Sequence, residues 1–440
     1  MTTKRLLVFA IISISVMGQT HLTLYQNQFG LVVEPISKSL HQGSNILTLH
    51  NIPEGVIPAS IVFDFGETIQ VRRQSFQHGW TGIQDASSKL LGQTVIIVMH
   101  DGSNFTGTIQ KMDGNAFLLS SNSGTEWVTK NDISRIKFNK QTNLDILPTL
   151  SAEIVANEAL EADGELSYLS RGLDWNADYT VLINKDETKI TFTSRVTLSN
   201  NTEISFQNAS LKLFAGQIHT LNVQRPQKAY RVSAMSRESS MEAVSSSPVM
   251  DFHEYQFPTD VNLPAYSENS LFFLEPFTVD MKKKYVFEGG RTEGKGCDIS
   301  VVFQAVKEGP ALPQGVIKSY ILNDKGEKSF IGESSLNHTS SGNPIHLKIG
   351  NAFDVIGSRE ITNRAGKTQK YREEEVEVTI RNEKETDVEV DVIENLGYGL
   401  WKVYDANLDW TQISAEKILF TVDVASKASQ TITYTRRFTY

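Results

Sequence analysis

The sequence is nearly devoid of cysteine, since Cys297 is the single one among its 440 residues. A lone thiol cannot form an intramolecular disulfide, so the fold has to be stabilised by apolar cores and by strand pairing. Long apolar runs are missing after Met17, whereas a membrane-spanning helix needs about 20 consecutive apolar residues. We therefore expect no transmembrane segment in the mature chain, which is long enough for about three domains.

The chain also lacks the short motifs that are typical of catalytic and nucleotide-binding sites. The chain has no Gly-x-Ser-x-Gly elbow, no phosphate-binding glycine loop and no dinucleotide fingerprint. His338 and His346 are separated by a Gly- and Pro-containing loop, which is not a metal-ligand spacing. Cys297 is predicted to lie in a glycine-flanked turn, Gly294–Asp298, before a strand at Ile299–Phe303, and no nearby histidine is identified as its base. The sequence thus predicts no catalytic residue, no cofactor and no metal ligand.

Positive charge is in deficit, with 42 Lys and Arg against 51 Asp and Glu and a formal net charge of −9. An acidic surface repels phosphate backbones and anionic lipids. We therefore expect no nucleic-acid partner. The charged run from Arg372 to Glu375 is most simply an exposed segment that enters a strand.

The N-terminus has the pattern of a secretory signal. Lys4 and Arg5 precede an apolar stretch that reaches Met17, which is too short for a helix that crosses a bilayer core of roughly 30 Å. Small residues suit the signal peptidase, so cleavage is expected between Gly18 and Gln19, with residues 1–18 as the signal peptide. No cysteine stands at this point to carry a lipid anchor. The sequence predicts an exported protein of the periplasm or cell surface.

Helical periodicity is nearly absent, and the dominant period is two, which places alternate side chains on opposite faces of a sheet. Residues 190–198 alternate apolar side chains with Thr and Arg. Val376–Ile380 alternates in the same way, and Val388–Val392 is expected to return as its hairpin partner. The prediction is an all-β, multi-domain fold with β-sandwich domains, of which the first is an N-terminal β domain at 19–85.

Residues 86–140 are predicted to form a separate inserted module. Tight turns at Asp101-Gly102, Asp113-Gly114 and Ser123-Gly124 separate short apolar strands, a cadence typical of small SH3-like or Sm-like barrels. Where Sm-like proteins place a base-contacting Asn, this chain has Phe117, and the Arg-Gly pair of their RNA pocket is missing. RNA binding by this module is therefore only a third alternative for the function.

A longer motif begins at Tyr168 and ends at Tyr179. Further segments that belong with it follow downstream, at Leu312–Gly315 and Leu347–Val355. Its characteristic residues are Tyr168, Gly172, Leu173, Trp175, Ala177, Asp178 and Tyr179. Through these residues the chain from about 147 to 440 resembles an uncharacterised exported bacterial family, domain of unknown function forty-one thirty-nine. Some relatives of that family carry the label mucoidy inhibitor. Residues 19–72 resemble the N-terminal β domain usually found with it.

This resemblance implies exported β-sandwich proteins without an established activity. Relatives commonly have a long coiled coil where this chain has the module at 86–140, so no role of a coiled coil transfers to it. Within the matching region we expect a first part at 147–226, a flexible linker or insertion at 227–250, a continuation at 251–345 and a C-terminal β-sandwich at 346–440.

The motif around Trp175 is predicted to have a structural role in core packing rather than a catalytic or binding role. Trp175 and Tyr179 share one face of a strand and should anchor a core, while Asp174 and Asp178 share the opposite, solvated face. The alternative is that Asp174 and Asp178 contribute to a cation or polyol site, although a hard cation needs more oxygen ligands than two carboxylates provide.

Taken together, the sequence predicts a non-catalytic binding or structural component of the cell envelope, whose partner is an envelope protein or a glycan. The main alternative is a carbohydrate-active or other hydrolase that brings dispersed carboxylates together on folding. A cleft with two carboxylates roughly 5–10 Å apart, lined by exposed aromatic residues, would favour that alternative.

Overall fold

The computed structural model describes residues 18–26, 28–67, 69–79, 90–138, 148–216, 244–250, 252–289, 294–305, 309–365 and 371–439. Strands make up 71% of it and helices 2%. The predicted all-β, multi-domain class is therefore confirmed. Of the signal segment, all but Gly18 lies outside the described residues. Within the described residues no helix is long and apolar enough to cross a membrane.

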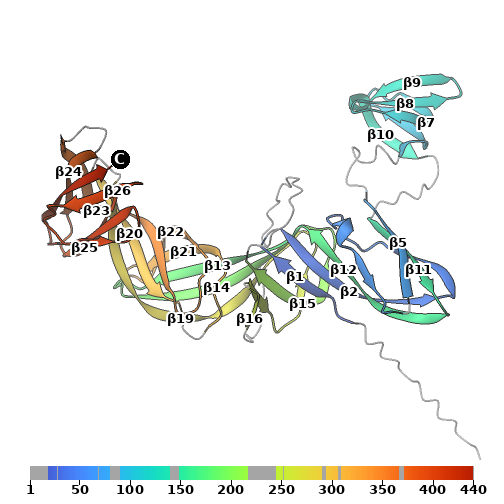
Figure 1. Cartoon of the computed structure of the whole chain (residues 1–440). Helices are drawn as coiled ribbons and strands as arrows, with labels where there is room; N and C mark the ends of the chain where they lie inside the picture. The colour runs from blue at the N-terminus through green and yellow to red at the C-terminus, as the bar shows by residue number, and fades with distance from the viewer. Residues whose placement is uncertain are drawn as a thin grey trace, which may run out of the picture.

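The N-terminal strands join an eight-stranded sheet with strands from the later part of the chain (Figure 1). Its members are β1 (His21–Tyr25), β2 (Phe29–Leu40), β4 (Val62–Asp64), β12 (Leu160–Arg171), β15 (Phe206–Ala215), β16 (Ser245–Val249), β17 (Phe252–Gln256) and β18 (Val261–Leu263). β1 pairs in parallel with β15, and β2 pairs along its whole length with β12. The prediction of an N-terminal β domain at 19–85 is therefore corrected, because the β1–β2 hairpin completes its sheet only with strands from beyond residue 147.

A three-stranded sheet lies next to the C-terminal end of β2 and the N-terminal end of β12. It consists of β3 (Gly43–Leu49), β11 (Thr149–Ala156) and β5 (Ile69–Gln77), with β11 in the middle. A one-turn helix, η1 (Pro58–Ser60), precedes β4. Leu47, Phe65 and Ile154 are buried between the two sheets, which gives this end of the molecule a small core of its own.

Residues 94–138 form a five-stranded antiparallel sheet whose strands pair with one another and with no other described strand. Its order is β10 (Ile133–Phe138), β6 (Thr94–Met99), β7 (Asn104–Met112), β8 (Ala116–Ser121) and β9 (Gly124–Thr129), and a one-turn helix, η2 (Lys130–Asp132), precedes β10. Val95, Ile109 and Phe117 are fully buried in its core. Its closer likeness to SH3-like or Sm-like folds stays a prediction.

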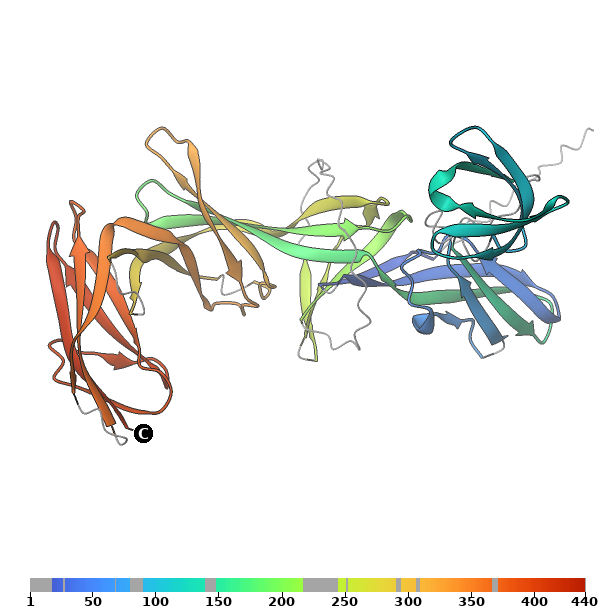
Figure 2. The ribbon, with the colours of Figure 1, turned by 90° about the horizontal axis from the view of Figure 1, so that it is seen from above.

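The largest sheet has thirteen strands and runs through two consecutive cores. Its first members are β13 (Leu173–Ile183), β14 (Lys189–Asn200), β19 (Ser267–Glu288), β20 (Lys295–Gln304), β21 (Gly315–Leu322), β22 (Lys328–Leu336) and β23 (Pro344–Ala365). The first part of β19 pairs with β14, and its last part pairs with β20 and β25. Seen from above, the two cores lie one after the other along these strands (Figure 2).

The boundary expected between residues 345 and 346 is also corrected. β19 and β23 each have 22 residues, which at about 3.3 Å per residue is longer than one core needs. Tyr285, Phe287 and Cys297 lie before the expected boundary, yet they are buried in the C-terminal core. Because shared strands cross from one core to the next, no linker separates the two units.

The C-terminal unit is a two-layered sandwich that β19, β20 and β23 begin and the last strands complete. These are β24 (Tyr371–Asn382), β25 (Val388–Asn395), β26 (Leu400–Tyr404), β27 (Thr411–Gln412), β28 (Lys417–Val424) and β29 (Ser429–Thr439). The predicted hairpin of β24 with β25 is wrong. β24 pairs with β23 and β29, whereas β25 pairs with β19 and β28, so the polar turn between them crosses from one layer to the other.

Most of the predicted linker at 227–250 lies outside the described residues. Ser245–Val249, however, form the edge strand β16, which pairs with β17. All five of its side chains are exposed. The sequence prediction missed this strand because main-chain pairing alone holds it, and such pairing leaves no apolar pattern.

Candidate functional site

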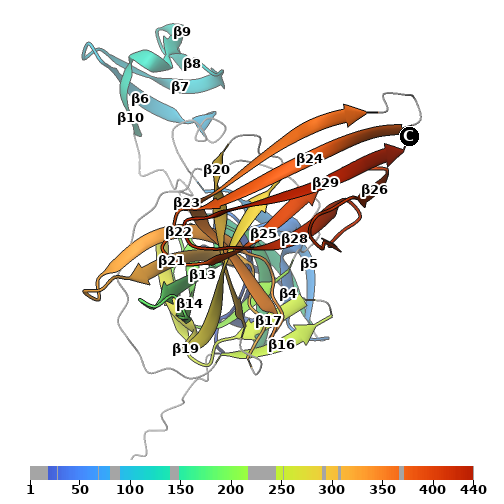
Figure 3. The same ribbon diagram turned by 90° about the vertical axis from the view of Figure 1, so that its left-hand side faces the viewer.

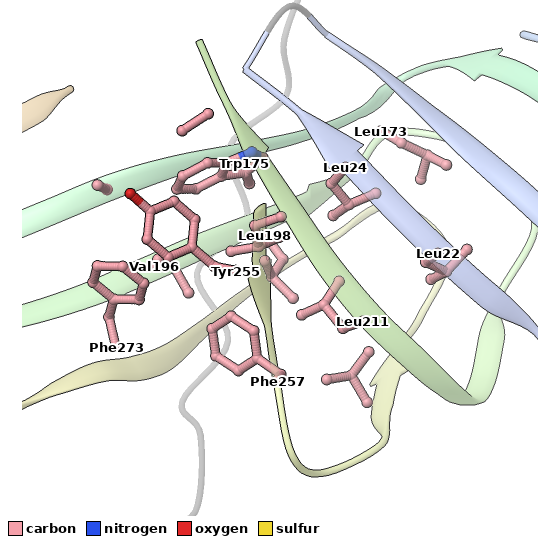
Figure 4. Close-up of a cluster of buried hydrophobic side chains, with 14 of the residues drawn as sticks. Leu22, Leu24, Leu173, Trp175, Val196, Leu198, Leu211, Tyr255, Phe257 and Phe273 are labelled. Atoms are coloured by element: carbon pink, nitrogen blue, oxygen red, sulfur yellow. The ribbon is translucent and has the colours of Figure 1, made fainter. Parts of the chain in front are cut away.

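The family-like motif is built into the first of the two consecutive cores, and we call the part of the molecule around this core the middle unit. Trp175 and Tyr179 are fully buried, as predicted, and the Trp175 ring packs near Tyr255 (Figure 4). The Trp175 Nε1 donates to the Phe214 carbonyl oxygen at 3.3 Å, and the Tyr179 hydroxyl donates to that of Pro313 at 2.7 Å. The remaining apolar members of the motif are buried as well, namely Tyr168, Leu173 and Ala177. Gly172 has a positive φ of 87° in the turn between β12 and β13.

The two acids of the motif have separate local partners. The Asp178 carboxylate accepts a hydrogen bond from the Thr197 hydroxyl at 2.6 Å, and that of Asp174 accepts one from the main-chain N–H of Trp175 at 2.8 Å. Burial raises the pKa of Asp174 to about 6, so this acid is less solvated than predicted. In the described part of the chain no three metal-binding side chains gather into a possible ion site. A cation site at Asp174 and Asp178 therefore gains no support.

Cys297 lies in strand β20 and is buried. The prediction of a turn at Gly294–Asp298 is therefore wrong, because the strand already begins at Lys295 and contains Cys297. Gly296 serves close strand packing, since a Cβ at this position would overlap the main chain of Ala352. The His338 Nδ1 accepts a hydrogen bond from the main-chain N–H of Gln314 at 3.2 Å, and His346 is exposed on β23.

The expected cleavage residues Gly18 and Gln19 lie just before β1, separated from it by Thr20. The Gln19 Nε2 donates to the carbonyl oxygen of Asn208 at 3.0 Å, at the surface of the molecule. Gly18 lies close to the Pro35 ring, so a Cβ added to it would come within 2.8 Å of that ring.

The most unusual cluster of charge lies at the free end of the C-terminal sandwich. Here β24 and β29 run on beyond β25 and β28 (Figure 3). Arg364 pairs with Glu374, and Glu374 pairs with Arg436, so strand register brings their side chains to one face. We call Arg364, Arg372, Glu374, Arg436 and Phe438 the arginine face.

One carboxylate in this face is surrounded by three guanidinium groups. The Glu374 side chain is 3% exposed, and its Oε2 accepts hydrogen bonds from Nε and Nη2 of Arg436 at 2.9 and 2.7 Å. The Nε atoms of Arg364 and Arg372 lie 3.5 and 3.4 Å from its Oε1. Arg436 alone can neutralise Glu374, so the other two arginines leave a surplus of positive charge. Their side chains are 58% and 43% exposed.

An aromatic ring is held between two of these arginines. The Arg372 and Arg436 guanidinium carbons lie 5.0 and 5.1 Å from the Phe438 ring centroid, within reach of a cation–π interaction. Trp401 is the register partner of Phe438 on the next strand, and its Nε1 donates to the Ala415 carbonyl oxygen at 2.9 Å. The stacked ring limits the freedom of both arginines, which reduces the entropy that a bound anion would cost them.

A second ion pair is buried between β23 and β25. The Arg359 Nε is 3.1 and 3.0 Å from the two carboxylate oxygens of Glu394, and the Tyr434 hydroxyl also donates to Glu394. Burial raises the pKa of Glu394 although Arg359 acts against it. A hollow of about 530 Å³ runs along the strand from Arg359 to Arg364.

This arrangement suits anion binding better than acid–base catalysis. Glu374 and Glu394 each accept hydrogen bonds from an arginine, so their carboxylate oxygens are already occupied as acceptors. Exposed guanidinium groups with unused N–H donors match carboxylate, sulfate or phosphate oxygens. Neither buried acid is placed as a free general acid or base.

The sequence prediction for Arg372–Glu375 is wrong at its centre, because Glu374 is buried rather than exposed. A signal for this burial exists in the sequence. Glu374 continues the period-two row of Val376 and Val378, and Glu394 continues that of Val390 and Val392. A charge in register with a core row indicates a buried ion pair.

No protein-family model matches the chain, and no curated protein matches its sequence.

Proposed function

We propose that this chain is an exported, non-catalytic binding component of the cell envelope and that the arginine face holds an anionic group of its partner. The observation that carries the proposal is the surplus positive charge around the single carboxylate of Glu374. The chain as a whole has a formal net charge of −9. A cationic face on an acidic protein attracts anions locally while the remaining surface repels them.

The shape of the molecule supports a binding role. Strands shared between the middle and C-terminal cores make a stiff joint, so the strands β23, β24 and β29 that carry the arginine face lie at one end of an elongated body (Figure 1). This end of the molecule would contact a partner in the envelope. The signal pattern and the family resemblance, which led to the expectation of export, support the proposal that the partner is a component of the envelope.

Neither alternative is favoured by a specific feature of the described residues. A hydrolase needs a free carboxylate pair, whereas Glu374 and Glu394 are both occupied by arginines. RNA binding by the five-stranded sheet would need a stacking side chain at Phe117, which is fully buried there.

The proposal is tested by measuring binding of the purified protein to immobilised polygalacturonate, polyglutamate and neutral dextran. Polygalacturonate stands for an acidic glycan and polyglutamate for an acidic protein segment. We expect binding to one of the anionic polymers, weakening with added salt, and none to dextran. Equal retention on dextran, or no retention on either anionic polymer, would refute the proposal.

The double variant Arg364→Ala/Arg372→Ala should bind roughly tenfold more weakly, which corresponds to about 1.4 kcal/mol. The matched control is Arg381→Ala/Lys427→Ala, which removes the same charge from exposed ion pairs at the opposite end of the same sandwich. The control should bind like the wild type. An equal loss in both variants would mean that net charge, not the arginine face, determines binding.

A further inference from the structure

The outer strand β3 of the three-stranded sheet has an edge that no other described strand occupies. It pairs with β11 on one side, and no described strand runs along its other side. An open edge presents unpaired main-chain N–H and C=O groups that can pair with another strand. Proteins commonly protect such edges with charges, prolines or β-bulges.

Other edges of this molecule carry those protections. β5, at the opposite edge of the same sheet, has exposed Arg72 and Arg73 and a register shift against β11. β16 contains Pro248. The last part of β23 has a register shift between Ile361 and Asn363.

β3 carries none of these features. Its seven residues, Gly43–Leu49, include no charge and no proline, and its pairing with β11 is regular. Ser44, Ile46 and Thr48 are exposed on its outer face, and Ile46 is 66% exposed. Leu47 points the other way, into the core. The edge of β3 is thus uncharged, free of proline and regular in its pairing, with the exposed apolar side chain of Ile46 near its middle.

We propose that β3 pairs antiparallel with β3 of a second copy of this chain, so that two three-stranded sheets join into one. A twofold axis perpendicular to the sheet keeps each side chain on its own face, which requires a register centred on a residue. Centred on Ile46, the pairing places Ile46 against Ile46 of the second copy and Ser44 against Thr48 of the second copy. Apolar and hydroxyl pairs of this kind stabilise antiparallel strands.

The composition of β3 selects a second copy over a charged peptide. An acidic or basic strand would find no opposite charge along the edge, whereas the self-pairing brings no like charges together. The next strand, β11, is compatible with this pairing too. Its Glu153 lies between Ile46 of β3 and Arg73 of β5 within each copy, so the carboxylate has an opposite charge beside it. The site is independent of the arginine face, so either proposal can fail alone.

Sedimentation velocity of the purified chain over a range of concentrations tests the pairing. We expect a dimer with twice the mass of one chain. Ile46→Lys and Ile46→Glu should each be monomeric, because like charges would meet at the axis. An equal mixture of the two variants should recover the dimer, since a lysine of one copy then faces a glutamate of the other across the axis. Ile413→Lys, at another exposed isoleucine, is the control that stays dimeric.

Single cysteines test the register, because the native Cys297 is buried. Directly opposite Cβ atoms lie about 4.5–5.5 Å apart, so Ile46→Cys should form a disulfide between two copies under mild oxidation. Ser44→Cys should not, since the two copies of this position are offset by about 13 Å along the strands. Unchanged circular dichroism would show that each variant is folded.

A wild-type protein that is monomeric at every concentration would overturn the proposal. So would an Ile46→Lys variant that remains dimeric, because the dimer would then use another surface. Equal cross-linking of Ile46→Cys and Ser44→Cys would overturn the antiparallel register.

Discussion

Asn200 and Asn382 hold equivalent turns in two different units of the molecule. Both side chains are fully buried. The Nδ2 of each lies within hydrogen-bonding distance of three main-chain carbonyl oxygens, at 2.8 to 3.2 Å for Asn200 and at 2.9 to 3.1 Å for Asn382. Each ends a similar strand, Val-Thr-Leu-Ser-Asn in the first case and Val-Thr-Ile-Arg-Asn in the second. The short sequence repeat therefore corresponds to a repeated structural feature.

Replacing either asparagine by alanine should destabilise the unit that contains it. The substitution leaves buried carbonyl groups without their donor, at a cost of about 2–4 kcal/mol. The control is Asn323→Ala in an exposed turn, which should cost less than about 1 kcal/mol. Urea unfolding measures these losses. Similar losses at all three positions would contradict the importance of burial.

The buried pair of Arg359 and Glu394 gives a second prediction. Glu394→Gln leaves the Arg359 charge buried without its counter-ion and should cost about 3–5 kcal/mol. The double variant Arg359→Met/Glu394→Gln should recover much of this loss, because no unpaired charge remains. Lys189→Ala removes an exposed pair with Asp280 and should change stability by less than about 1 kcal/mol. A double variant as unstable as Glu394→Gln would argue against this account.

Glu34 should make stability depend on pH. Burial raises the pKa of this carboxyl from 4.5 to about 7, against the opposing hydrogen bond from Tyr168. The folded state therefore binds a proton more tightly than the unfolded state, so stability falls as the pH rises from about 4.5 to about 7 and then levels off. A pKa difference of this size corresponds to about 3 kcal/mol.

Glu34→Gln removes this titration while keeping the shape of the side chain. The variant should be as stable as the wild type near pH 4 and more stable near pH 8, as measured by urea unfolding at each pH. Equal stability of the two proteins near pH 8 would show that Glu34 ionises without cost.

Gly315 gives a prediction about close strand packing. It lies at the start of β21, where a Cβ would overlap the Ala177 carbonyl oxygen and lie 2.9 Å from the Tyr179 ring. Gly315→Ala should therefore destabilise the middle unit by about 1–3 kcal/mol. Gly350→Ala is the matched control, because nothing lies within 4 Å of its added Cβ. The midpoint of thermal unfolding should fall for the first variant and stay nearly unchanged for the second.

Much of the core could be predicted from local sequence patterns. Alternation along residues 190–198 and the spacing of Trp175 and Tyr179 identified strands and their buried faces, because in a strand the two faces are fixed by parity alone. The same rule, applied to Glu374 and Glu394, would have indicated buried charges. Their arginine partners could not be identified in this way, since Arg359 and Arg436 come from other strands.

The sequence by itself determined the strand-rich class, the buried faces and the expectation of export, since each depends on neighbouring residues. Only the tertiary structure decided which strands pair. It joined β1 to β15, placed β24 and β25 in opposite layers, and left the edge of β3 open. The physical reason is that a strand presents the same main-chain groups to any partner, so the choice is made by the packing of the whole core.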